Sequence, residues 1–141
     1  MYDANNPTME LSTKNVHSGK YSVKIYRAAR DDDGASAGLK QTITLDAPLE
    51  ADTEFTLSAW TYSDAKVDRR ISLAATFPKG TTLKAGTYLG TSTGTLEEDV
   101  TLTKDSTYTL AYVNNSVAGW NQSELSIVVP AGAAKLNVNV Y

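Results

Sequence analysis

Two aromatic residues, Trp60 and Tyr62, are the side chains of this sequence best placed to bind a ligand. They lie two residues apart in an alternating stretch, and such residues of a β-strand point to one side of the sheet. Two aromatic rings there can form a flat platform for sugar rings, which present C–H groups to a π-face. The alternative is that Trp60 packs under a loop or against a second sheet, because large aromatics dominate buried contacts. Arg69 and Arg70 could add hydrogen bonds to sugar hydroxyls or acidic groups, although charged rim residues commonly contact only solvent.

The residues that could support catalysis are few. His17 is the only histidine and lies in a predicted turn, and no signature joins it to the nucleophile and carboxylate that a catalytic triad requires. Glu97 and Asp99 share one face of a predicted strand, and paired carboxylates can hydrolyse a glycoside. A solvated strand face is the preferred explanation of this pair. We therefore expect a protein that is not an enzyme. Hydrolysis of a glycan by Glu97 and Asp99 is kept as the weakest of three functional hypotheses, after the two given below.

Oxygen ligands for a metal ion are concentrated in the run Asp31-Asp32-Asp33-Gly34. This run lacks the alternating ligand spacing of a dedicated calcium loop, and we interpret it as a solvated loop. The sequence contains no cysteine, so thiolate metal sites and disulfides are excluded. No cofactor is expected, and no set of metal-ligating residues is recognisable.

The charge balance argues against a nucleic-acid partner. The chain carries 13 basic and 16 acidic residues, a net charge of -3, and its nearest approach to a basic patch is Arg69-Arg70, close to Asp64 and Asp68. No apolar run approaches the length of a membrane span, so we expect no membrane insertion. Residues 1–7 lack the basic and apolar regions of a signal peptide. The sequence thus predicts either use without secretion or processing from a larger chain.

The elements that position these side chains are predicted to be short β-strands. No segment has a sustained 3.6-residue apolar period, whereas Thr, Val, Ile and Tyr are frequent and favour pleated surfaces. Eight to ten alternating segments, separated by Gly or Pro, recur about every ten residues. They centre on residues 21–26, 39–45, 55–62, 71–77, 88–89, 96–102, 108–112, 120–129 and 136–140. This pattern predicts an all-β fold, an antiparallel β-sandwich of the jelly-roll type.

One domain is expected for 141 residues. Residues 1–15 are polar and are interpreted as an N-terminal arm with little structure, while residues 16–141 form a single β-sandwich domain. Tyr108 and Tyr112 share the parity of the leucine between them, which predicts that both belong to the core. Trp120 opens a strand and is expected to pack rather than to bind, since tryptophan is highly buried on average.

Three segments of the chain resemble a known family. Val16–Ile25 (VHSGKYSVKI), Gln41–Leu45 with Phe55–Trp60 (QTITL and FTLSAW), and Trp120–Gly132 resemble, in order and spacing, the jelly-roll carbohydrate-binding modules appended to xylanases and other glycanases. The resemblance covers roughly residues 16–140. It implies a non-catalytic module that recognises a glycan through surface aromatics.

The chain departs from this family at both ends. Such modules usually begin with a strand that carries an acidic residue and an aromatic, and they end with one strand more than this chain, which stops at Tyr141. In the family these two pieces usually help to hold a structural calcium ion. The resemblance therefore makes calcium possible here without supplying a matching set of ligands.

A structural or assembly role is the alternative function. A decoration or fibre domain of a virus capsid, or a cell-surface adhesion domain, agrees with the initial Met, the missing secretion signal and the incomplete terminal strand pair. Ala134–Tyr141 is predicted to be a strand with an unpaired edge, covered by the arm or by a neighbouring chain through strand addition. Under either function we expect an extracellular location or one on a particle surface.

Overall fold

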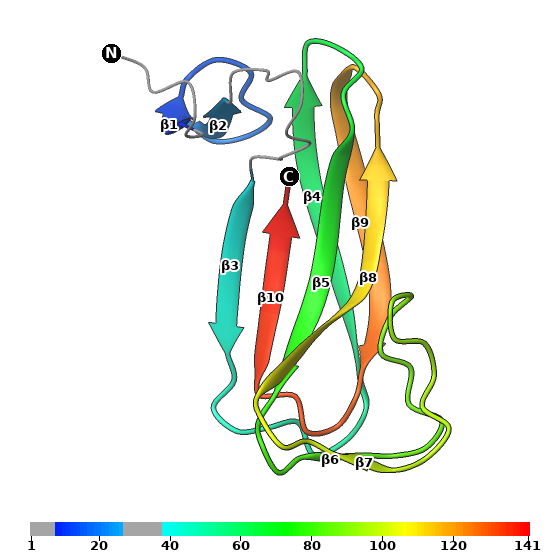
Figure 1. Cartoon of the computed structure of the whole chain (residues 1–141). Coiled ribbons are helices and arrows are strands. Elements are labelled where there is room, and N and C mark those ends of the chain that lie inside the picture. Colours follow the sequence, from blue (N-terminus) through cyan, green and yellow to red (C-terminus); the bar gives the residue numbers. More distant parts are fainter. Residues whose placement is uncertain (1–7, 27–37) are drawn as a thin grey trace.

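The computed structural model describes residues 8–26 and 38–141 of the chain. Within these residues the chain forms ten β-strands and no helix (Figure 1), so no described helix has the length and apolar character needed to cross a membrane. The strands are β1 (Thr8–Ser12), β2 (Ser22–Tyr26), β3 (Leu39–Thr44), β4 (Thr53–Ser63), β5 (Arg69–Phe77), β6 (Thr82–Leu83), β7 (Val100–Thr101), β8 (Ser106–Asn115), β9 (Gly119–Val129) and β10 (Lys135–Val140).

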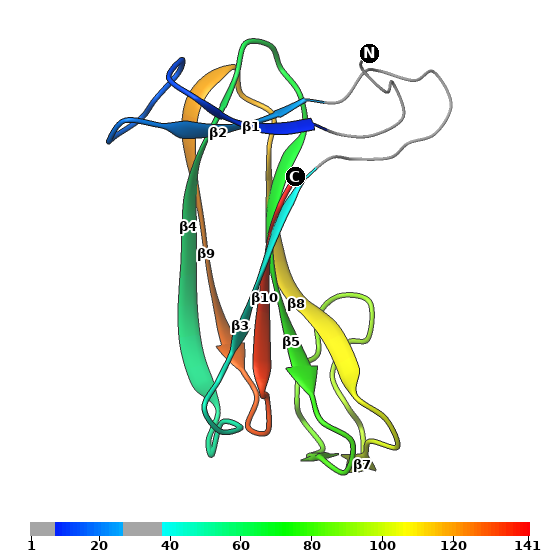
Figure 2. The ribbon, with the colours of Figure 1, turned by 90° about the vertical axis from the view of Figure 1, so that its left-hand side faces the viewer.

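The strands form a β-sandwich of antiparallel sheets. The larger sheet has four strands in the order β3-β10-β5-β8. A two-stranded sheet, β4-β9, forms the facing layer (Figure 2). β1 pairs with β2 as a separate hairpin, and the short strands β6 and β7 pair with each other. The expected all-β, antiparallel character is therefore confirmed.

Alternating side chains fill the space between the two sheets. In β4 the odd-numbered residues Phe55, Leu57 and Ala59 pack against the core, and the even-numbered residues between them are exposed. β5 lies between two neighbours and is buried along most of its length, as expected for a central strand. The buried apolar residues are Ile71, Leu73, Ala74, Ala75, Phe77, Leu83, Leu89, Leu102, Leu110, Leu125, Val129, Ala133 and Leu136.

Polar side chains link all four strands on the far side of the larger sheet. The Thr42 hydroxyl donates to Asn137 Oδ1 at 2.9 Å, and the amide of Asn137 donates to Thr76 Oγ1 at 3.1 Å. The Thr76 and Thr107 hydroxyls are 2.7 Å apart. Asn137 is buried, and these bonds offset the cost of removing its amide from water.

A β-bulge reverses the expected position of Tyr112. The register of β5 and β8 shifts between Leu73 and Ala74, and Leu110 is the extra residue in β8. A bulge lets two consecutive residues face the same side, so the alternation changes phase beyond it. Tyr108 remains half-buried, whereas Tyr112 is 45% exposed on the opposite side of the sheet. The prediction that Tyr112 belongs to the core is wrong for this reason.

The two ends of the chain also differ from expectation. Residues 8–12 of the predicted arm form β1, hydrogen-bonded to β2. β10 is paired on both sides, with β3 and with β5. The predicted unpaired edge at residues 134–141 is therefore wrong, because β3 supplies the second neighbour. Among the described residues, the outermost strands of this sheet are β3 and β8.

Candidate functional site

The side of the β4-β9 sheet that faces away from the core carries the aromatic residues singled out by the sequence. The register of the two strands shows which residues lie on this side: Tyr62 pairs with Trp120, Trp60 pairs with Gln122, and every second pair along the strands follows. We call this surface the outer face. Its residues are Glu54, Thr56, Ser58, Trp60 and Tyr62 of β4 and Trp120, Gln122, Glu124, Ser126 and Val128 of β9.

Four aromatic rings gather at one end of the outer face. His17, from the turn of the β1-β2 hairpin, stacks on Trp60 with ring centroids 4.2 Å apart and planes 21° apart. The same imidazole meets Trp120 edge-on at 5.2 Å, and Tyr62 lies 5.4 Å from Trp120. We call these four residues the aromatic cluster. Tyr62 and Trp60 therefore lie on one side of the sheet, as expected, and they are linked through the other two rings.

Trp60 is both packed and accessible. His17 covers part of the Trp60 ring, in agreement with the alternative that Trp60 packs under a loop. Nevertheless, 47% of Trp60 stays exposed. The imidazole of His17, which itself contacts Trp120, limits the motion of this ring. An aromatic surface held in place in this way suits stacking on a flat ligand.

Tyr62 is tied to the strand end by its hydroxyl. The phenol O–H donates to Asp64 Oδ1 at 2.9 Å. This hydrogen bond, followed by repulsion from the Asp64 carboxylate and by desolvation, raises the pKa of Tyr62 above its ordinary value. The hydrogen bond to Asp64 holds the Tyr62 ring at the end of β4.

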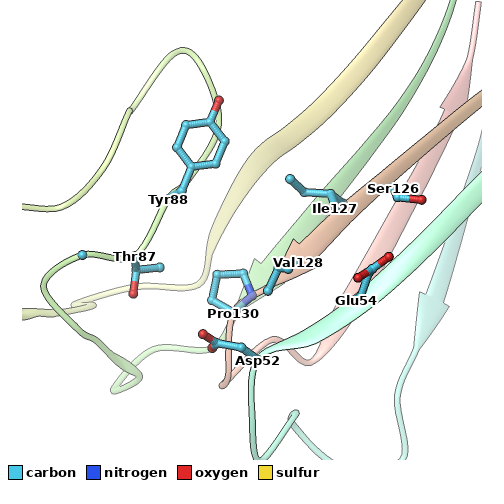
Figure 3. Close-up of a pocket in the computed structure, with 9 residues that line it drawn as sticks. Asp52, Glu54, Thr87, Tyr88, Ser126, Ile127, Val128 and Pro130 are labelled. Carbon is cyan, nitrogen blue, oxygen red and sulfur yellow. The ribbon is translucent and has the colours of Figure 1, made fainter.

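A groove of about 500 Å³ lies at the other end of the β4-β9 sheet (Figure 3). The ring of Tyr88 and the side chain of Val128 form apolar walls, and both residues are substantially exposed. The carboxylates of Asp52 and Glu54 border the same space (Figure 3). Asp52 is fixed, because its Oδ1 accepts the backbone N–H of Ala131 at 2.9 Å.

The loop that carries Tyr88 is firmly anchored. Tyr88 forms a β-bridge with Thr95, and its neighbour Leu89 is fully buried in the core. Gly90 has φ +86° and packs against the backbone of β8, where a Cβ would lie 1.9 Å from the carbonyl oxygen of Thr109. Only glycine fits there, so the exposed Tyr88 ring projects from a loop with little freedom.

Arg69 does not belong to the outer face. It is buried, and its guanidinium donates to the backbone carbonyls of Val117 and Gly119, the latter at 3.4 Å, and to Asn115 Oδ1 at 3.3 Å. Its function is to satisfy acceptors of the turn between β8 and β9. The prediction of Arg69 as a ligand-binding residue therefore has no support in the geometry.

Arg70 lies on the opposite side of the molecule from Trp60. Its Nε donates to Asn114 Oδ1 at 2.8 Å, and its Cζ lies 4.3 Å from the centre of the Tyr112 ring. These partners belong to the far side of the four-stranded sheet. The structure thus brings Trp60 and Tyr62 together and separates both arginines from them.

The carboxylates considered for catalysis are not arranged as a pair on a strand. Glu97 lies in a bend before β7. Asp99 accepts the N–H of Ala85 and the ammonium of Lys84, each at 2.9 Å. The backbone hydrogen bond from Ala85 and then the contact with Lys84 lower the pKa of Asp99. Asp99 is therefore a structural carboxylate that anchors the loop beside the groove.

Residues 8–26 and 38–141 contain no group of three or more His, Asp or Glu side chains that could hold a metal ion. The run Asp31–Asp33 lies outside the described residues.

Sequence reasoning missed the positions of two residues, His17 and Tyr88. Trp120 packs against His17 and Tyr62, in agreement with the expectation, and does so on the outward-facing side of the sheet. His17 and Tyr88 come from loops, where no periodicity indicates which way a side chain points. Their positions depend on contacts between segments far apart in the chain.

Comparison of the chain with family models, with curated proteins and with solved structures gave no match. The resemblance to carbohydrate-binding modules thus remains a prediction from the sequence.

Proposed function

We propose that this protein is a non-catalytic glycan-binding module of jelly-roll type whose ligand lies along the outer face. The observation that carries the proposal is the half-exposed indole of Trp60, on which His17 stacks while the same imidazole contacts Trp120. Burial is the usual fate of so large an apolar ring. A ring that is exposed yet immobilised supports recognition, because little side-chain entropy is lost when a ligand stacks on it.

Polar groups around Trp60 suit the hydroxyls of a sugar. Gln122 is its direct cross-strand partner, and Ser58 and Glu124 form the next pair along the same face. These side chains supply both donors and acceptors. From Trp60 to Glu54 the strand advances about 20 Å, so an extended glycan of several units could contact the aromatic cluster and the groove together. Binding at two weak points would give useful avidity.

The strand order supports the jelly-roll part of this proposal. From β3 the chain crosses to β4 in the other sheet and returns to β5. It crosses again from β8 to β9 and returns to β10. Such wrapping makes the first and last strands of the larger sheet, β3 and β10, neighbours, as in Greek-key sandwiches. The short pair β6-β7 occupies the sequence position of two further strands that would complete eight.

The test is a titration with neutral oligosaccharides of several linkages, followed by calorimetry or ligand-observed NMR. Trp60→Ala is expected to weaken binding about 10-fold or more, equivalent to about 1.4 kcal/mol. Tyr112→Ala is the matched control, because Tyr112 is similarly exposed but lies on the other sheet. An absence of binding at millimolar glycan, or equal affinities of the two variants, would contradict the proposal.

An assembly role remains the second candidate, and the β1-β2 hairpin favours it. Met9, Leu11, Val23 and Ile25 occupy one side of this hairpin by their register, and Met9 and Leu11 are 65% and 71% exposed. A two-stranded sheet is marginal on its own, and grouped apolar side chains at a surface mark contact sites. A partner chain on a particle or cell surface would cover them.

Light scattering over a range of protein concentrations tests self-assembly. If the hairpin mediates it, the mass rises with concentration and the paired change Met9→Ser and Leu11→Ser abolishes the rise. A strict monomer at every concentration would count against assembly with a second copy. The Tyr112→Ala variant serves as the control, because Tyr112 is exposed on the far side of the larger sheet, away from the hairpin.

A further inference from the structure

We propose that the outer face prefers glycans that carry free amino groups, such as glucosamine oligomers, over neutral and uronic-acid glycans. This inference rests on the proposed function and concerns the groove end of the face. It follows from the charges of the face, from the lining of the groove and from the position of the nearest lysines.

The outer face is acidic. Its ten residues include two carboxylates, Glu54 and Glu124, and no basic side chain. Asp52 adds a third carboxylate where β4 begins. A carboxylate attracts an ammonium group and repels another carboxylate, so the sign of the charge on the glycan affects affinity directly.

The groove offers an ammonium group two kinds of partner. The Oδ1 atom of Asp52 accepts the N–H of Ala131, and the side chains of Asp52 and Glu54 both border the groove. The Tyr88 ring stands across from these carboxylates (Figure 3). A sugar ring can pack on Tyr88 and Val128 while its ammonium group forms charge-assisted hydrogen bonds to the acids.

The lysines near this surface do not cancel the charge of the groove. The Lys84 ammonium, from the loop beside the groove, is paired with Asp99 at 2.9 Å. Lys14 and Lys20 belong to the turn that carries His17, which packs on Trp60. That contact lies about 20 Å along the strand from Glu54, beyond the Debye length of about 8 Å at physiological salt.

The experiment compares three oligomers of equal length, built of glucosamine, N-acetylglucosamine and a hexuronic acid. Because the carboxylates are exposed, we expect the glucosamine oligomer to bind about 3- to 10-fold more tightly than the acetylated one at low salt. The uronic-acid oligomer should bind weakest. The preference should decrease at about 0.5 M salt, where screening is strong.

Two substitutions locate the effect. Glu54→Gln is expected to remove most of the preference, measured as the ratio of the two affinities. Asp68→Asn, an exposed carboxylate just before β5 at the other end of the sandwich, should leave that ratio unchanged. Equal affinities for the glucosamine and acetylated oligomers, or a ratio that Glu54→Gln does not alter, would overturn the inference.

The Trp60→Ala variant separates this inference from the proposed function. If the acetylated oligomer binds and Trp60→Ala weakens it, but no charge preference exists, the inference fails and the proposed function stands. If the glucosamine oligomer binds equally well to Trp60→Ala and to the wild type, the proposed function fails, and the inference fails with it.

Discussion

Replacing Gly90 by alanine tests whether the loop that presents Tyr88 is held as tightly as its geometry indicates. Gly90 has φ +86°, and an added Cβ would lie 1.9 Å from the carbonyl oxygen of Thr109. This distance is far below van der Waals contact, and the oxygen belongs to backbone. The loop or β8 would therefore have to move.

Gly86 provides a matched control in the same loop. Its φ is +85°, nearly equal to that of Gly90, but an added Cβ would meet nothing within 4 Å. Gly86→Ala should cost only the strain of a left-handed alanine, about 1–2 kcal/mol. Gly90→Ala adds a shift of packed backbone, about 1–3 kcal/mol more, for a total of about 2–5 kcal/mol.

Chemical denaturation of the wild type and of both variants measures these differences as changes in the midpoint at constant slope. The excess for Gly90→Ala over Gly86→Ala isolates the overlap, because the backbone conformations match. Equal destabilisation in the two variants would refute the close approach of this loop to β8. It would also remove the argument that Tyr88 is rigidly presented.

Two further predictions concern residues that the structure assigns to stability. Arg69→Met should destabilise the protein by about 1–3 kcal/mol, because carbonyl groups of the β8-β9 turn lose a buried donor. Arg70→Met should destabilise the protein less, by about 1 kcal/mol, since only a partly exposed cation–π contact and one hydrogen bond are lost. A larger loss of stability in Arg70→Met than in Arg69→Met would contradict this assignment. The carboxyl of Asp99 should titrate below the ordinary aspartate range in NMR, because its charged form is hydrogen-bonded. The ionised Asp99 stabilises the folded protein above the pKa of the unfolded state, and this stabilisation is lost as pH falls through the pKa of the folded state. A titration midpoint of Asp99 at or above the ordinary aspartate value would contradict the prediction.

Much of the outer face could be predicted from the sequence. The alternation of residues 55–62 indicated that Trp60 and Tyr62 share a side, and β4 has that arrangement. Strand periodicity is a local property, so it can be read from neighbouring residues alone. It failed for Tyr112, where a bulge in β8 shifts the phase without any glycine or proline to mark it.

The partners of these residues could not be predicted in the same way. The contact of Tyr62 with Trp120 depends on the register between β4 and β9, and the contact of His17 with Trp60 depends on where a hairpin turn docks. Arg69 is adjacent to Arg70 in the chain and has the same charge, yet only Arg69 meets the carbonyls of a distant turn. Contacts of this kind are set by tertiary structure, and neither composition nor spacing encodes them locally.

The most direct test of the central claim is an NMR titration of the two indole N–H signals, since the chain has only two tryptophans. The signals are assigned by Trp60→Phe and Trp120→Phe, and a neutral oligosaccharide is added to the wild type. The Trp60 signal is expected to shift in a saturable manner, together with backbone signals of Gln122 and Glu124 on the same face. Saturable binding that leaves the Trp60 signal and the outer face unchanged would contradict the central claim.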